Sequence, residues 1–233
     1  LEHIERFGTC RLQALKDLGA RRIFEAYQWV QDHQHEFQRD VHGAILLEVN
    51  LLNQDYAAYL EGQVPDYLWK AFVTDSPHDQ NLLNMNLKKF RVPVLNFVPS
   101  PDDPSPSLTT QMQGLGIQAR LIDVFTAPPT VKKILRTVAM LDHSFIGTSE
   151  TNRQANQASK LGVMDLWTPE NHYRWQAPRY GCHISANVVL VKPARIFSQS
   201  ADTREQRELQ QKKLVVEETL GSINNESRHQ SGE

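Results

Sequence analysis

The chain has 233 residues, 40% of them hydrophobic, which is enough to bury one large core or two smaller ones. Its formal net charge of −2 excludes a protein that is strongly basic or acidic as a whole. Cys10 and Cys182 lack the spacing of a disulfide framework or a zinc knuckle. With no signal peptide and no apolar run of membrane-spanning length, a soluble intracellular protein is expected.

The first forty residues predict helices. Ile23, Tyr27 and Val30 recur at i, i+4 and i+7, which is the spacing of an amphipathic helix. An earlier helix is expected over Arg11–Leu18. We therefore expect residues 1–43 to form an N-terminal helical segment that contains a coiled-coil stub and the start of the next domain.

Three short apolar runs follow, with helical patterns between them. The runs Ala44–Val49, Trp69–Val73 and Val92–Val98 have the length of buried strands. Ser76 stands before a proline and is predicted to cap the second of the intervening helices. The pattern predicts a β-α-β-α-β subdomain with a parallel sheet over residues 44–98.

Residues 99–107 contain four prolines in nine positions. Proline lacks a backbone donor and favours extended conformations, so neither a helix nor an interior strand is expected there. The segment predicts a linker to a second subdomain over residues 108–198. Its expected elements are helices at Leu108–Leu115 and Thr130–Leu141, a strand at Phe145–Ile146, a helix ending at Gly162, a strand at Val163–Trp167 and a β-rich return over Tyr173–Val191.

The sequence changes character after Ser198. Leu209, Val216 and Leu220 have coiled-coil-like spacing, so residues 199–221 are predicted to form a C-terminal coiled-coil stub. Residues 222–233 are polar without an apolar period, which predicts a disordered tail. The whole pattern predicts the α/β class.

Nucleotide and metal sites are not indicated. Asn50–Asn53 follows the first apolar run where a phosphate-binding unit would have glycines, and no Gly-Lys pair exists for a P-loop. His33, His35 and His42 cluster near Glu36, but their spacing matches no metal-binding pattern. Surface histidines on a polar helix end are the favoured interpretation.

Two further groups contain residue types of nucleophilic enzymes. Asp142-His143-Ser144 and Cys182-His183 are adjacent residues, and adjacent side chains point in different directions instead of converging. We therefore expect no catalytic residue, no metal ion and no cofactor in this chain.

Basic residues concentrate in the second half. Between Ser107 and Ser198 there are ten lysines and arginines and five acidic residues. Between Ala44 and Val98 there are four lysines and arginines and six acidic residues. Aromatic and basic residues are interleaved within seventeen residues of the second half: Trp167, His172, Tyr173, Arg174, Trp175, Arg179, Tyr180 and His183. Bases of a single strand stack on rings while cations neutralise phosphates, so the cluster predicts nucleic-acid contact in the second half. The alternative is that the tryptophans belong to the core and the arginines only solvate a surface.

The stretch from Gly19 to Tyr180 resembles the hinge of the structural maintenance of chromosomes (SMC) family. The ten-residue run Leu166-Trp-Thr-Pro-Glu-Asn-His-Tyr-Arg-Trp175 is the most specific part of the resemblance. The other matching segments are Ala26-Tyr-Gln-Trp-Val-Gln31, Gly43–Asn50, Trp69-Lys-Ala-Phe72 and Arg91-Val-Pro-Val-Leu-Asn96.

The resemblance implies an SMC hinge-like fold of two subdomains, with βαβ units and short flanking coiled-coil helices. It implies pairing with the hinge of the sixth SMC protein, contact with single-stranded or double-stranded DNA, and a complex with further subunits that serves DNA repair and chromosome organisation. A location in the nucleus, on chromosomes, is expected. ATP belongs to the distant heads of such proteins, so no ATP is expected here.

Candidate contact residues follow from the open strand edges and the basic cluster. For pairing we expect Phe145, Ile146, Gly147, Ile184, Ala186, Val188 and Leu190. For DNA we expect Lys132, Lys133, Arg136, Arg153, Arg174 and Arg179, with Tyr173 and Trp175 as stacking platforms.

Two other functions are compatible with the pattern. The first is a structural connector that pairs without touching DNA. The second is a small-molecule α/β enzyme with a site at the carboxyl ends of parallel strands, near Asn50 and Thr74.

Overall fold

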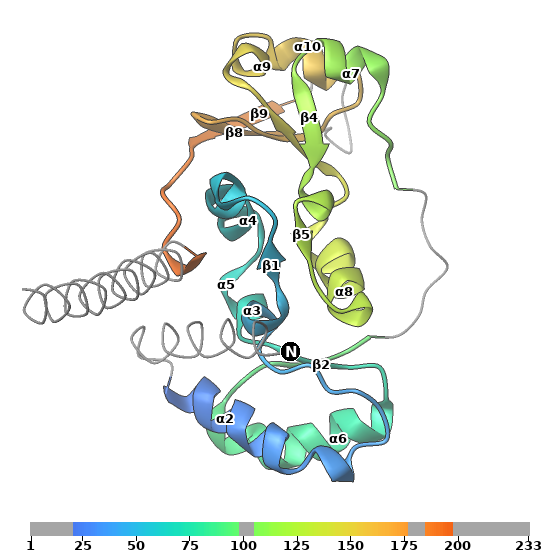
Figure 1. The fold of residues 1–233 in the computed structure, drawn as a ribbon. Coiled ribbons are helices and arrows are strands. Elements are labelled where there is room, and N and C mark those ends of the chain that lie inside the picture. Colours follow the sequence, from blue (N-terminus) through green and yellow to red (C-terminus); the bar gives the residue numbers. More distant parts are fainter. Residues whose placement is uncertain (1–20, 98–104, 177–184, 198–233) are drawn as a thin grey trace, which may run out of the picture.

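The structure is a computed structural model that describes residues 21–97, 105–176 and 185–197 (Figure 1). Several predictions concern other residues and lie outside this described part. They are the helix at Arg11–Leu18, most of the proline-rich segment, Cys182, the contacts of Arg179 and Ile184, the C-terminal stub and the tail.

The amphipathic helix predicted from Ile23, Tyr27 and Val30 is confirmed as α2 (Arg21–Asp32). Ile23, Ala26 and Val30 are buried along one face, and Tyr27 packs against the same core. The spacing of the apolar residues thus correctly predicted which face of the helix is buried. A 3₁₀ turn, η1 (Gln34–Glu36), follows.

The predicted strand at Ala44–Val49 is wrong. This run forms a short helix, α3 (Ile45–Glu48), and the strand β1 (Asn50–Leu51) begins only after it. Ile45 and Leu46 are fully or almost fully buried. A short apolar run satisfies a buried helical turn as well as a buried strand, so the pattern could not separate the two.

One βαβ unit is confirmed. The strands β2 (Phe72–Thr74) and β3 (Val94–Asn96) pair in parallel on either side of α6 (Pro77–Leu87). Ser76 caps α6 by accepting a hydrogen bond from the amide of Asp79 at 3.3 Å, as predicted. This sheet has two strands, so the longer β-α-β-α-β pattern is not formed.

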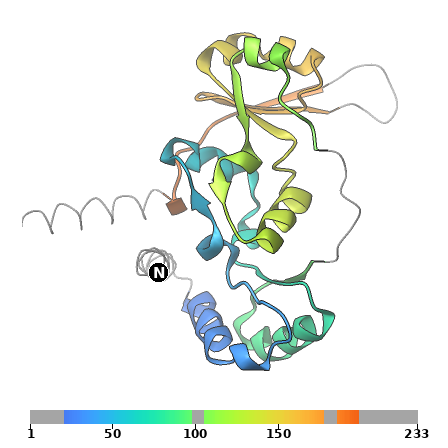
Figure 2. The same cartoon turned by 45° about the vertical axis from the view of Figure 1, so that its right-hand side comes forward.

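Short helices connect these strands. They are η2 (Gln54–Tyr56), α4 (Ala57–Gln63), α5 (Asp66–Trp69) and η3 (Lys88–Phe90). Figures 1 and 2 show α2 and α6 at the end of the molecule opposite the sheet of the second half.

A five-stranded sheet organises the second half. Its strand order is β4-β6-β7-β8-β9, and neighbours are antiparallel except for the parallel pair β6–β7. The strands are β4 (Ile117–Arg120), β6 (Ser144–Gly147), β7 (Asp165–Trp167), β8 (Asn171–Gln176) and β9 (Ser185–Leu190).

Helices accompany this sheet. Figure 1 shows α7, α9 and α10 together on one side of it, with α8 on the other. The predicted helix at Thr130–Leu141 is confirmed as α8, with Val131, Ile134 and Leu135 buried. The bounds are α7 (Thr110–Gly114), η4 (Leu121–Asp123), α8 (Pro129–Ala139), α9 (Ser149–Arg153) and α10 (Ala155–Lys160).

Two hydrophobic cores hold the fold, and they do not divide at residues 99–107. The larger core joins Phe72 of the first half to Phe125 and Leu135 of the second. The antiparallel pair of β1 with β5 (Phe125–Thr126) bridges the same halves. The smaller core lies between the five-stranded sheet and its helices, and it comprises Met112, Ile117, Phe145, Ala155, Ala158, Val163, Leu166 and Trp175.

None of the helices within the described ranges combines the length and apolar character needed to cross a membrane.

Candidate nucleic-acid interface

The aromatic residues of the predicted cluster face inward. Trp175 is only 5% exposed and belongs to the smaller core, so its predicted role as a stacking platform for bases is wrong. Strand alternation sends every second side chain of β8 to the core face, and Trp175 lies on that face. Trp167 is also buried, stacked on His172 with ring centroids 3.7 Å apart.

Tyr173 is half-buried and already has partners. Its hydroxyl donates to Asn152 Oδ1 at 2.8 Å, and its ring stacks on Trp175 at 5.5 Å. The ring therefore helps to attach β8 to α9. Sequence alternation alone could not reveal which rings the sheet buries.

The predicted cations lie on different surfaces. Lys132 and Lys133 extend from α8 over the rings of Phe125 and Phe97, at 5.5 and 5.6 Å. They do not line the groove that contains Arg174.

Arg136 and Arg153 are paired with acidic residues. Arg136 donates to the buried carboxylate of Asp142 at 2.8 Å, and Arg153 lies 3.1 Å from Glu150. Neither lines the groove with Arg174. Contact of these two residues and of the two lysines with DNA stays a prediction.

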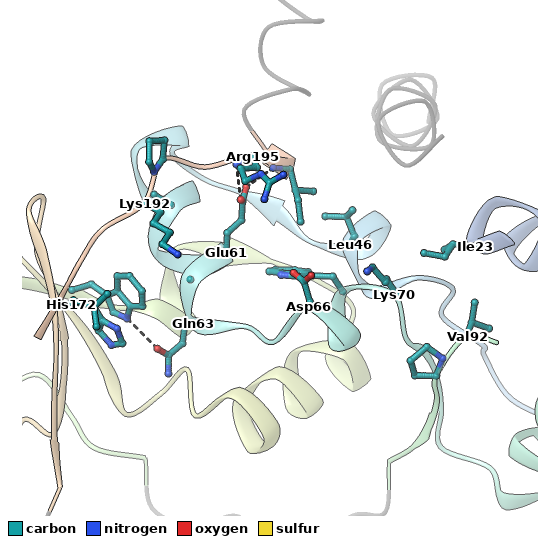
Figure 3. A pocket seen from close by; sticks show the side chains of 18 of the residues that line it. Ile23, Leu46, Glu61, Gln63, Asp66, Lys70, Val92, His172, Lys192 and Arg195 are labelled. Carbon is teal, nitrogen blue, oxygen red and sulfur yellow. Dashed lines mark hydrogen bonds between the residues drawn. The ribbon is translucent and has the colours of Figure 1, made fainter. Parts of the chain in front are cut away.

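The structure assembles a cationic groove of about 1290 Å³ from separate segments (Figure 3). Seven lysines and arginines line it, against three acidic residues. The cations are Arg21, Arg22, Lys70, Arg91, Arg174, Lys192 and Arg195, and the acids are Glu25, Glu61 and Asp66. We call this feature the groove.

The lining of the groove also contains apolar side chains, among them Trp69, Phe90, Trp167 and Ile196. Trp69 and Trp167 are buried, whereas Phe90 and Ile196 are partly exposed, so the groove combines positive charge with a limited apolar surface. Such a combination suits an anionic polymer that also carries planar groups.

Arg174 is oriented in the groove by neighbours. Its Nε donates to Asp165 Oδ2 at 2.8 Å, and one terminal nitrogen donates to Gln63 Oε1 at 3.1 Å. Gln63 Oε1 also accepts from Trp167 Nε1 at 3.2 Å. The side chain of Arg174 remains 43% exposed, so its charge is fixed in place and reaches solvent.

The other groove cations were missed in the sequence because they are far apart along it. Arg21 and Arg22 begin α2, Lys70 follows α5, and Arg91 ends η3 with a left-handed φ of 54°. Four of the seven groove cations thus come from the first half of the chain, although the charge distribution pointed to the second half alone. The adjacent pair Arg21-Arg22 was the one contiguous signal.

The predicted pairing residues divide into two sets. Phe145, Ile146 and Gly147 lie on β6, which pairs with β4 on one side and β7 on the other. The open edge expected at these residues is therefore absent, because both sides of the strand are occupied.

The two end strands of the described sheet are β4 and β9, and the predicted strand from Ile184 to Val191 corresponds to β9. This strand pairs with β8 and is last in the order of the described sheet. Ala186, Val188 and Leu190 are on it, and Val188 and Leu190 are 49% and 74% exposed. These residues therefore lie on an end strand of the described sheet, while contact with a partner stays a prediction.

The site expected for an α/β enzyme is not assembled. Asn50 lies on β1, which pairs with β5 and not with β2, and Thr74 is fully buried. Ser144 donates to the carbonyl of Met140, so it does not join Asp142 and His143 as a triad. Over the described ranges, no group of three or more His, Cys, Asp or Glu side chains could hold a metal ion.

The chain was compared with family models, curated proteins and solved structures. No family model matches the chain. The chain is 44% identical over 237 residues to Structural maintenance of chromosomes protein 5 of Arabidopsis thaliana, covering 98% of this chain and 22% of that protein. It therefore spans about a fifth of the length of this relative.

Solved structures were compared as well. The Smc5/6 hinge domain of S. pombe is similar with a TM-score of 0.76 at 16% identity, covering 98% of this chain and 88% of that one. The SMC hinge domain of Geobacillus stearothermophilus gives a TM-score of 0.48 at 15% identity, covering 95% and 92%.

The fold is that of an SMC hinge domain, which confirms the α/β class and the resemblance found in the sequence. The sequence identity makes the assignment more specific. The chain belongs to the family of structural maintenance of chromosomes protein 5 and corresponds to its hinge region.

Proposed function

We propose that this hinge pairs with the hinge of the sixth SMC protein and holds DNA in the groove, within a nuclear complex that maintains and repairs chromosomes. The pairing surface is the β9 edge, and the DNA-binding surface is the lining of the groove. The module itself catalyses no reaction, and ATP hydrolysis belongs to other segments of the parent protein.

The DNA part of the proposal rests on the charge of the groove, which is lined by seven lysines and arginines and only three acidic residues. Each phosphate neutralised by lysine or arginine releases counterions, which favours binding. A duplex presents mainly phosphates, whereas a single strand also presents unstacked bases to partly exposed apolar side chains such as Phe90 and Ile196. Single-stranded DNA is therefore the preferred ligand.

The open edge of β9 supports the pairing part. An unpaired strand edge presents backbone donors and acceptors that another strand can satisfy. Val188 and Leu190 add apolar surface that pairing would remove from water. The S. pombe structure with the similar fold is described as a Smc5/6 hinge domain, which supports the choice of partner.

Titration of a fluorescent single-stranded oligonucleotide tests the DNA part. Affinity should fall steeply with salt, with a slope of log K against log salt of about −0.7 for each phosphate contacted. Anisotropy at several salt concentrations measures this slope. An affinity that stays constant from low to high salt would contradict phosphate contact. It would favour the alternative function, a structural connector that pairs without binding DNA.

Size-exclusion chromatography of the two hinges, mixed at micromolar concentration, tests the pairing part. A single 1:1 complex is expected. Two independent peaks would remove the pairing proposal.

A further inference from the structure

The segment that leaves β9 returns to the larger core at Phe197. Phe197 is 2% exposed and packs edge-on against Trp69, with ring centroids 5.4 Å apart. Its carbonyl accepts a hydrogen bond from Gln54 Nε2 at 2.9 Å. This anchor attaches Phe197, at the end of residues 192–197, to α5 and η2.

Glu61 of α4 holds this segment through its carboxylate. Its Oε2 accepts the amide of Arg195 at 2.7 Å, and its Oε1 accepts the amides of Ile196 and Phe197 at 2.9 and 2.7 Å. Hydrogen bonds to a carboxylate are stronger than those between neutral groups. One side chain thus fixes three consecutive backbone positions.

The same segment supplies two of the groove cations, Lys192 and Arg195. Figure 3 shows Glu61 reaching Arg195 from α4, with Lys192 on the neighbouring stretch of chain. Glu61 is therefore an acid in a cationic groove, but its oxygens are directed to backbone amides.

We propose that Glu61 is a positioning residue of the groove, which holds residues 195–197 so that Arg195 and the nearby Lys192 meet the DNA backbone. This inference rests on the proposed function, because it assigns a role within the same DNA site. Glu61 supports the binding of an anion although it carries the same sign of charge.

Charge alone and positioning give opposite expectations for the removal of this acid. If only charge mattered, Glu61→Gln would strengthen DNA binding by relieving repulsion. If Glu61 positions the segment, Glu61→Gln weakens binding, because the new amide nitrogen meets a backbone donor where an oxygen accepted before. Asp66 is the matched acid: it lines the same groove, is exposed, and does not hold residues 195–197.

The test measures the affinity of the hinge for a fluorescent oligodeoxythymidine at low salt. Asp66→Asn should bind about twofold tighter through lower repulsion, and Glu61→Gln about fivefold weaker through loss of fixed cations. In a double-mutant cycle, Lys192→Ala should weaken binding less in the Glu61→Gln background than in the wild type. General loosening of the fold would not produce this coupling.

Gln54→Ala provides a second variant that leaves the charge of the groove unchanged. Gln54 does not line the groove, yet it holds the carbonyl of Phe197 on the same segment. Weaker DNA binding by Gln54→Ala is expected, and it supports positioning even if Glu61→Gln does not fold. Thermal unfolding and size-exclusion chromatography verify that each variant is folded.

The outcomes separate the two proposals. Wild-type protein that binds DNA, together with tighter binding by Glu61→Gln or unchanged binding by Gln54→Ala, overturns the positioning role alone. Wild-type protein that binds no DNA overturns the proposed DNA site, and the role of Glu61 with it.

Discussion

The groove draws its seven cations from segments spread between Arg21 and Arg195, whereas the β9 edge presents its exposed side chains along six consecutive residues. The two surfaces meet at β9, since Val189 and Leu190 also line the groove. A surface made of consecutive residues can be predicted from a strand pattern. A surface made of dispersed residues exists only after folding. Substitutions at residues that belong to only one of the two surfaces, such as Val188, should therefore separate their roles.

The largest effect is expected at the β9 edge. Val188→Asp should weaken pairing with the partner hinge by about a hundredfold, because a charge would be buried against an apolar strand. Val188 does not line the groove, so DNA affinity should stay within about twofold of the wild type. Isothermal titration calorimetry with the partner hinge measures the first quantity and anisotropy the second.

Met85→Asp is the matched control for this prediction. Met85 is 79% exposed on α6, far along the chain from β9, and its replacement should leave pairing unchanged. Equal loss of pairing in both variants would break the distinction between the two surfaces.

A substitution of Asp79 tests the stability of the fold independently of the two binding surfaces. Its carboxylate is fully buried and accepts the amides of Gln38 and Arg39 at 3.0 and 2.9 Å. Asp79→Asn should lower the free energy of unfolding by about 2 kcal/mol, because Asn offers one acceptor oxygen instead of two. Urea unfolding at neutral pH measures this, with the exposed Asp75→Asn expected to change little.

The same carboxylate predicts a direction for the pH dependence of stability. Burial acts to raise the pKa of Asp79, but hydrogen bonds from Gln38, His78, Arg39 and Ser76 outweigh it and hold the pKa below the ordinary 3.8. The unfolded chain therefore takes up the proton first as the pH falls. Stability from this group is complete above the ordinary pKa and decreases below it, which urea unfolding between pH 5 and pH 3 should show as a decline that Asp79→Asn reduces.

Loss of positive charge from the groove should have a smaller effect, on the affinity for single-stranded DNA. Arg22→Ala combined with Lys70→Ala should weaken single-strand binding by about tenfold and make the salt slope shallower by about 1.4, which is about 0.7 for each phosphate that is no longer neutralised. Lys132→Ala combined with Lys133→Ala removes the same charge from α8. A larger effect of the α8 pair would place the DNA on α8 and its lysines instead of in the groove.

The smallest effect is expected at Gly62 of α4, which lines the groove. A Cβ at Gly62 would lie 2.5 Å from Cη2 of Trp167, so Gly62→Ala should destabilise the fold by about 1 kcal/mol. Gly114 of α7 has open space around it, and Gly114→Ala should be neutral or slightly stabilising. Thermal unfolding of the two variants compares them, and equal effects would show that Trp167 does not pack tightly on α4.

Local signals in the sequence predicted much of the fold. The spacing of Ile23 and Val30 identified α2, Ser76 identified the start of α6, and the apolar face of α8 was predicted correctly. Each of these predictions used a pattern contained within one helix. The run Ala44–Val49 failed because its conformation is set by distant packing, not by its own pattern.

The candidate site was predictable only in part. Arg174 was identified and does line the groove, but Trp175 on the same strand points into the smaller core. The sequence shows that aromatic and basic residues are neighbours along the chain. In a strand, however, neighbouring side chains point to opposite faces of the sheet, so these residues do not form one surface. Gln63, Asp165 and Glu61 escaped notice because their roles appear only through partners that are remote in sequence, such as the amides near residue 196.

The pairing of Leu51 with Phe125 joins strands on opposite sides of the proline-rich segment. The larger core likewise needs Phe72 from the earlier part and Leu135 from the later part. Cleavage between residues 98 and 104 would therefore produce two pieces with complementary, incomplete interiors. Such pieces should behave as a split protein, poorly folded when separate and restored when mixed.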